Sequence, residues 1–234
     1  MNRFAFACSR RRRPPVLTFA PLAWLKLQFF CHAGPTEIGG FATAAADNLL
    51  YVEEFQTVRQ QVTPLSVQFD DQAVADFFDA CVDRGLTPDR FARIWCHTHP
   101  AASVEPSTTD EETFWRSFGG CDWAVMFILG RTGLSSARLS FAAGPRGDVH
   151  LPVEVDWAAW PASAPDALPD LVADWSAEFT AHIHPLPEPV IAAPLSSKAS
   201  SFVDPWDGWD PWDGSAGDPF HPSELEEILH EPFA

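Results

Sequence analysis

Three side chains that can bind a metal ion lie close together in the stretch Trp95-Cys96-His97-Thr98-His99-Pro100 and the Ser107-x-x-Asp110 that follows it. Because His97 and His99 are two residues apart, their side chains project from the same face of a strand. Asp110 then comes from the first turn of a helix. Two imidazole nitrogens and one carboxylate oxygen suit zinc, and three protein ligands leave a fourth position for water. The stretch therefore predicts a metal site where a strand meets a helix.

Cys96 lies between the two histidines, but the alternation of the strand at 91–97 places Ile94 and Cys96 on the opposite face. We interpret Cys96 as a buried core thiol rather than a ligand. Glu105, Glu111 and Glu112 also lie close to the motif in sequence, and we interpret them as solvated carboxylates.

Composition limits the class of protein. With 234 residues, 46% of them hydrophobic, the chain can bury one good core and leave a tail. The net charge of −17 argues against a nucleic-acid partner. Five scattered cysteines without a C-x-x-C pair indicate reduced thiols in a cytoplasmic protein. No apolar stretch is long enough for a membrane span, so no membrane partner is expected.

The order of patterns predicts an α/β fold. Strands are expected at 16–19, 37–42, 49–52, 55–62, 65–69, 91–97, 123–129, 134–141 and 148–157. Helices are expected at 21–34, from Asp70 or Asp71 to Gly85, at 107–119, and at 169–182.

Four regions are expected along the chain. Residues 1–15 form a basic arm around the arginine run 10–13, and residues 16–157 form the main domain. Residues 158–184 are an Ala/Pro-rich segment with a possible helix, and residues 185–234 are a disordered, acidic, Trp-rich tail. Within the tail, residues 223–229 have a capping box and predict a short acidic helix. The tail tryptophans either fold back on the domain or dock into a partner, and the sequence does not choose.

The metal motif has a further member upstream. Glu37 heads the predicted strand Glu-Ile-Gly-Gly, and seven residues separate His99 from Ser107. Alone, each part is weak: strand histidines often satisfy local hydrogen bonds, and Ser-x-x-Asp is a common helix start. Together they resemble the JAMM motif of the MPN+ zinc metalloproteases, which is a Glu, then H-x-H-P, then S-x-x-D. Every position of that motif is present.

This resemblance covers about residues 16 to 157, and it is strongest to bacterial single-domain members of the family, which are deubiquitinase-like isopeptidases. It implies a curved, mixed, largely antiparallel β-sheet flanked by helices. It also implies that His97, His99 and Asp110 hold one Zn²⁺ per chain, that Glu37 is the general base, and that Ser107 donates to the oxyanion. The implied reaction is hydrolysis of the peptide or isopeptide bond at the C-terminus of a ubiquitin-like protein. Activating and conjugating enzymes of such a pathway are the further partners that it suggests.

Two alternatives remain open. The first is a non-enzymatic MPN-type interaction module that recruits a partner through its tail, and the second is a JAMM peptidase that acts on sulfur-carrier or small-molecule conjugates. Other zinc hydrolases fit less well. Nucleoside deaminases need H-x-E and a later P-C-x-x-C, and zincins need H-E-x-x-H, and the sequence has none of these.

Overall fold

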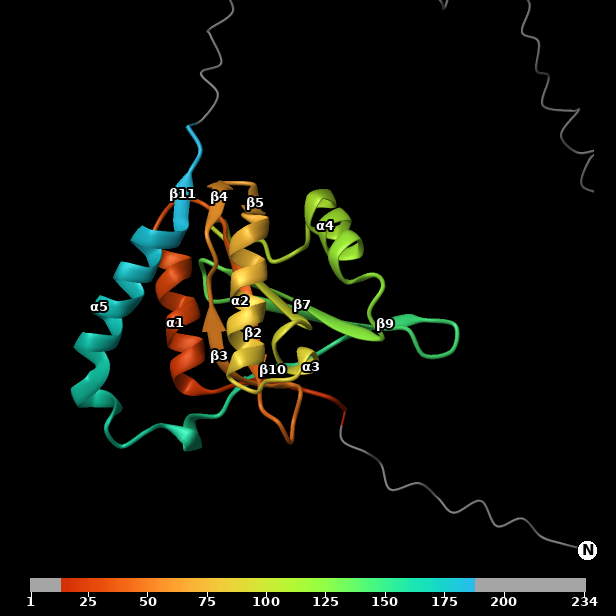
Figure 1. The fold of residues 1–234 in the computed structure, drawn as a ribbon, viewed down its shortest axis with the longest axis horizontal. Helices are drawn as coiled ribbons and strands as arrows, with labels where there is room; N and C mark the ends of the chain where they lie inside the picture. Colours follow the sequence, from red (N-terminus) through yellow and green to blue (C-terminus); the bar gives the residue numbers. More distant parts are fainter. Residues whose placement is uncertain (1–13, 188–234) are drawn as a thin grey trace, which may run out of the picture. The chain divides into compact units, whose positions relative to one another are not determined.

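A computed structural model describes residues 14–187, which form an α/β fold around a curled, mixed β-sheet (Figure 1). The expectations for the arginine run, for most of the tail and for the short helix at 223–229 lie outside the described residues. Among the described residues, no helix combines the length and apolar character that crossing a membrane requires.

The main sheet has eight strands in the order β10-β1-β3-β2-β6-β7-β8-β9. β1 runs parallel to both β10 and β3, and β6 runs parallel to β7, whereas the other neighbours are antiparallel. Its strands are β1 (Leu17–Phe19), β2 (Ile38–Ala44), β3 (Tyr51–Gln56), β6 (Ile94–His99), β7 (Trp123–Gly130), β8 (Ser135–Phe141), β9 (Gly147–His150) and β10 (Val153–Val155).

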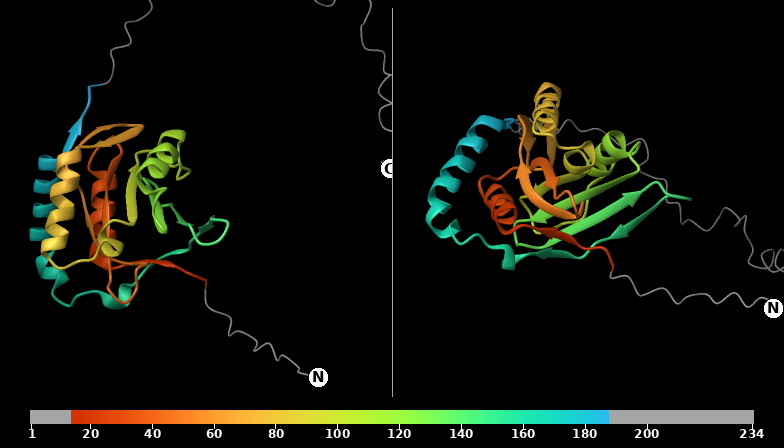
Figure 2. Two further views of the ribbon diagram at one scale, coloured as in Figure 1. Left: turned by 45° about the vertical axis from the view of Figure 1, so that its right-hand side comes forward. Right: turned by 60° about the horizontal axis from the view of Figure 1, so that its bottom comes forward.

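The sheet curls into a half-barrel, because β9 and β10 lie at its two edges although only Leu151 and Pro152 separate them (Figure 2). Leu151 N–H donates to Ala137 O on one side, and Leu17 N–H donates to Pro152 O on the other, both at 2.9 Å. The prediction of one continuous strand at 148–157 is therefore wrong. Pro152 has no N–H to continue the β8 ladder, so the chain changes partner there.

A smaller sheet has the order β11-β4-β5 and consists of β4 (Gln60–Thr63), β5 (Ser66–Phe69) and β11 (Ile183–Pro185). The predicted strand at 55–62 is therefore wrong as one element. The chain leaves the main sheet after Gln56, where the N–H of Thr57 donates to Glu178 Oε1 at 2.9 Å instead of joining a ladder. The buried Gln60 side chain then bonds both N–H and O of Gly39, at 2.8 Å each, which ties the two sheets together.

Helices cover both faces of the main sheet. α1 (Pro21–His32) and α5 (Ala164–His182) pack on one face, over a core that includes Leu27, Phe30 and Trp175. α2 (Asp71–Asp83) and α4 (Thr108–Phe118) pack on the other face. The short helix α3 (Pro88–Phe91) leads into β6, and a 3₁₀ turn, η1 (Trp157–Ala159), precedes α5. The α5 helix begins five residues before its predicted start at Pro169. Pro165 lies in its first turn, where a missing N–H costs nothing.

Gly40 occupies a position on β2 with no room for a side chain. A Cβ there would lie 2.3 Å from Gln56 O and 2.7 Å from the Phe55 ring. Because a backbone carbonyl cannot rotate away, we expect Gly40→Ala to destabilise the fold by about 1–3 kcal/mol. Urea denaturation measures this. Gly120→Ala is the matched control, since a Cβ there meets nothing within 4 Å, and it is expected to stay within about 0.5 kcal/mol of wild type. Equal effects of the two substitutions would contradict this account.

Candidate metal centre

The two histidines are presented by β6, which lies in the middle of the main sheet between β2 and β7. His97 is paired with Gly39 and Ile128, and His99 is paired with Gly130. The predicted alternation is confirmed, because Cys96 packs in the core shared with α1 whereas Trp95 faces the core shared with α4. Hydrogen-bonded strands on both sides fix the backbone that carries the histidines.

Asp110 reaches the histidines from the first turn of α4. The nearest separations are 3.4 Å from Asp110 Oδ1 to His97 Nε2 and 3.6 Å from Asp110 Oδ2 to His99 Nε2. One ligand atom from each of the three residues lies within 4.8 Å of the others, and all three residues are buried. Within residues 14–187, neither Nε2 has a hydrogen-bond partner. Since buried polar atoms are normally paired, these two nitrogens fit a site that holds a metal ion.

A loop fixes the orientation of His99. Its Nδ1 lies 3.0 Å from the carbonyl oxygen of Ser103, so an Nδ1–H donated to this oxygen leaves the Nε2 lone pair facing Asp110. The loop itself packs on the end of β7, where Arg131 N–H donates to Ala101 O at 3.1 Å. It approaches Gly130 so closely that a Cβ there would lie 3.0 Å from Val104 Cγ1. The end of β7 thus holds the loop that orients the histidine.

Ser107 and Asp110 form the capping box that the sequence predicts. Ser107 N–H and Ser107 Oγ–H both donate to Asp110 Oδ2 at 2.7 Å, and Asp110 N–H donates to Ser107 Oγ at 3.1 Å. The interpretation of Glu111 as a solvated carboxylate is wrong, because both of its oxygens accept from the Arg138 guanidinium at 2.6 Å. This ion pair with β8 fixes the start of α4. The Asp110 carboxylate is therefore held by its own helix cap and by the sheet.

Glu37 lies beside the triad without belonging to it. Its Oε1 is 3.8 Å from His99 Nε2, and its Oε2 has no hydrogen-bond partner in the described part of the chain. Its backbone is anchored, since Glu37 N–H donates to Thr63 O at 2.9 Å and the next N–H, that of Ile38, donates to Thr98 Oγ1 at 3.1 Å. The strand start therefore aims a buried carboxylate at the histidines.

Burial and neighbouring charges shift the pKa of each group. Burial raises the pKa of Glu37 to about 7, although His99 opposes the rise. Burial lowers the pKa of His97, which favours the neutral imidazole. Burial also lowers the pKa of His99, but Asp110 and Glu37 outweigh it and the net shift is upward. Burial opposes ionisation of Asp110, yet contacts with both imidazoles and Ser107 hold its pKa well below the usual value. A carboxyl with a pKa near 7 can accept and release a proton at neutral pH.

The structure brings the five predicted residues to one place, where β2, β6 and α4 begin or end; they are Glu37, His97, His99, Ser107 and Asp110. Sequence reasoning missed the contribution of Ser103. It acts through its backbone carbonyl, which carries no residue-specific signal.

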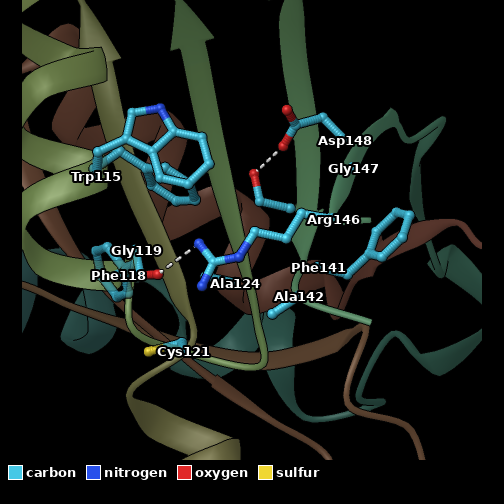
Figure 3. Close-up of a pocket in the computed structure, with 12 residues that line it drawn as sticks. Trp115, Phe118, Gly119, Cys121, Ala124, Phe141, Ala142, Arg146, Gly147 and Asp148 are labelled. Atoms are coloured by element: carbon cyan, nitrogen blue, oxygen red, sulfur yellow. Dashed lines mark hydrogen bonds between the residues drawn. The ribbon is translucent and has the colours of Figure 1, made fainter. Parts of the chain in front are cut away.

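A separate pocket of about 240 Å³ lies between α4 and the β8–β9 hairpin (Figure 3). Trp115 and Phe118 line one wall, and the Arg146 guanidinium reaches across to donate to Gly119 O at 3.3 Å. None of the five site residues lines this pocket. It is therefore distinct from the metal centre.

The fold and the site thus define a buried two-histidine, one-aspartate centre that can hold a metal ion, with an adjacent carboxylate. Comparison of the chain with models of known protein families gives no match, and comparison with curated proteins gives none either.

Proposed function

We propose that the chain is a zinc-dependent peptidase of the JAMM/MPN+ type, which hydrolyses the peptide or isopeptide bond at the C-terminus of a ubiquitin-like protein. One observation carries the proposal. A buried cluster of three metal-ligating side chains lies beside a fourth carboxylate, that of Glu37, whose Oε1 is 3.8 Å from the nearest ligand nitrogen. A purely structural metal site is closed by four protein ligands, whereas three ligands plus a neighbouring base suit hydrolysis.

The donor set favours zinc. Two of the three ligand atoms are imidazole nitrogens, whereas magnesium and calcium prefer sites built from oxygen. His97 and His99 would bind through Nε2, and Asp110 through a carboxylate oxygen. A bound zinc ion would supply Lewis-acid chemistry, polarising the scissile carbonyl and lowering the pKa of water towards ~7.

Glu37 moves the proton in the proposed reaction. Its carboxylate accepts a proton from the attacking water as the carbonyl carbon becomes tetrahedral. It then delivers that proton to the nitrogen of the leaving amine as the C–N bond breaks, which releases a free amine and a carboxylic acid that loses its own proton to solvent. In the metal-free site, burial raises the pKa of Glu37 to about 7, so this carboxyl exchanges a proton more readily near neutral pH than an ordinary glutamate does.

Ser107 is the proposed donor to the developing oxyanion. In the structure its hydroxyl donates to Asp110 Oδ2 at 2.7 Å. To act on substrate, the hydroxyl must turn towards the substrate oxygen while its Oγ continues to accept from Asp110 N–H. The cap and the catalytic role use different parts of the same hydroxyl, so they are compatible.

Substitution of Ser107 separates these two roles. We expect Ser107→Ala to lower kcat by about 100- to 1000-fold through loss of the donor. The lost cap should lower stability by about 1 kcal/mol. Ser107→Thr keeps both the hydroxyl and the cap and is expected to restore most of each. Steady-state kinetics and thermal melts measure the two effects, and unchanged kcat in Ser107→Ala would remove Ser107 from the mechanism.

The substrate class rests on the resemblance of the motif. Cleavage assays with linear and isopeptide-linked ubiquitin-like fusions test it, with zinc content measured on the same preparation. Cleavage of one of these fusions supports the proposal. A zinc-loaded protein that cleaves no fusion favours action on sulfur-carrier or small-molecule conjugates, or the interaction-module alternative, and trials with amino-acid conjugates distinguish those two.

A further inference from the structure

The two histidines of the metal centre are held in different ways. His99 Nδ1 is bonded to Ser103 O, whereas neither nitrogen of the His97 ring has a hydrogen-bond partner among the described residues. A histidine that binds metal normally donates its second N–H to an acceptor, which fixes the orientation of the ring. For His97 some other contact has to perform this function.

The Trp95 ring makes that contact. Its centroid lies 4.4 Å from the His97 ring centroid, with the two planes inclined by only 26°. Trp95 is 3% exposed and His97 is fully buried, so water does not separate the rings. The indole Nε1 makes no hydrogen bond to any described residue, so Trp95 contacts His97 through its aromatic face and not through a hydrogen bond.

Trp95 is itself held rigidly. It is paired with Phe41 of β2 and with Met126 of β7, in the centre of the sheet. Its side chain belongs to a buried cluster with Phe114, Phe118, Ile128, Ala124, Val58 and the two paired residues. A ligand supported by a fixed aromatic plane is confined to one ring orientation without a hydrogen bond.

We propose that Trp95 is a positioning residue of the metal centre, whose indole face holds the His97 imidazole with Nε2 directed at the metal. This inference rests on the proposed function, because it takes His97 to be a zinc ligand. When the imidazole binds a cation and becomes electron-poor, contact with the electron-rich indole face favours the bound state further.

The test compares metal binding in three variants of the full chain. Trp95→Leu removes the aromatic face, and we expect its zinc affinity to fall by about 10- to 100-fold, as for other supporting residues of metal sites. Trp95→Phe keeps an aromatic face and is expected to bind zinc within about threefold of wild type. Phe91→Leu is the control for general core damage. Phe91 is 2% exposed and packs against Phe77 and Phe78.

Affinity is measured by competition with a chromophoric chelator below the melting temperature of every variant. The visible spectrum of the Co²⁺-substituted protein reports the ligand geometry independently of catalysis. Weaker binding and an altered cobalt spectrum in Trp95→Leu alone support the inference. If Trp95→Leu does not fold, Trp95→Met replaces it, because the unbranched and flexible methionine side chain adapts to the space that the indole leaves.

Two results overturn the inference and leave the proposed function standing. One is wild-type zinc affinity with an unchanged cobalt spectrum in Trp95→Leu. The other is an equal loss of affinity in Phe91→Leu, which would mean that any damage to the core weakens the site. A wild-type protein that binds no zinc instead overturns the proposed function, and this inference with it.

Discussion

Glu37→Gln is expected to abolish hydrolysis while zinc stays bound. The amide has nearly the same shape as the carboxyl but cannot accept the proton of the attacking water, so we expect kcat to fall by about 100- to 10,000-fold. Glu37 is outside the ligand triad, and its Oε2 has no partner among the described residues, so its replacement breaks no hydrogen bond there. Kinetics on a cleavable fusion, together with zinc stoichiometry by elemental mass spectrometry, measure both parts.

Glu105→Gln provides the matched control. Glu105 is an exposed carboxylate in the loop before α4 and holds no position in the motif. It is expected to keep wild-type kcat and zinc content. If Glu37→Gln kept both its zinc and its full activity, the role of Glu37 as general base would be wrong. If it lost its zinc, Glu37 would instead be needed for the metal site.

Asp110→Asn is expected to remove the metal. Asparagine keeps the shape of the side chain but supplies no negative charge to a divalent cation. We expect zinc affinity to fall by more than the ~100-fold that is the upper limit when a residue that only orients a metal ligand is replaced. Ligand binding stabilises the folded state, by about 2.7 kcal/mol at a zinc concentration 100 times the Kd. Zinc should therefore raise the melting temperature of wild type and leave that of Asp110→Asn nearly unchanged. Equal increases would contradict the assignment of Asp110.

The same variant predicts a pH dependence for the metal-free protein. Contacts with the histidines and Ser107 hold the pKa of Asp110 below its unfolded value of about 3.8, so ionised Asp110 stabilises the fold above that pH. This stabilisation is lost as the pH falls through the lowered pKa. We expect metal-free Asp110→Asn to be less stable than wild type at pH 7, and the difference to shrink below about pH 4. Melts across this pH range measure it, and a difference that is absent at pH 7 would contradict this electrostatic account.

Local patterns in the sequence were enough to predict the parts of the site that local geometry determines. The alternation along β6 separates His97 and His99 from Cys96, because strand side chains point to opposite faces in turn. The Ser107-x-x-Asp110 spacing predicts a capping box, which the structure confirms. Both features depend only on residues within a few positions of one another.

Features that depend on distant partners could not be predicted. β3 ends at Gln56 because the backbone of Thr57 bonds to Glu178, which is 121 residues away. Glu111 is paired with Arg138 across 27 residues, so its neighbours in sequence give no indication of an ion pair. Such contacts are set by how α4 and α5 pack on the sheet, and helix and strand patterns do not specify that packing.

We propose that one zinc ion held by His97, His99 and Asp110 enables this chain to hydrolyse a ubiquitin-like conjugate. The most direct measurement is the cleavage rate of an isopeptide-linked ubiquitin-like fusion by metal-stripped protein, titrated with zinc. We expect no cleavage without zinc and full recovery at one zinc per chain. Cleavage at an undiminished rate by the stripped protein, or no cleavage after one zinc per chain has bound, would contradict it.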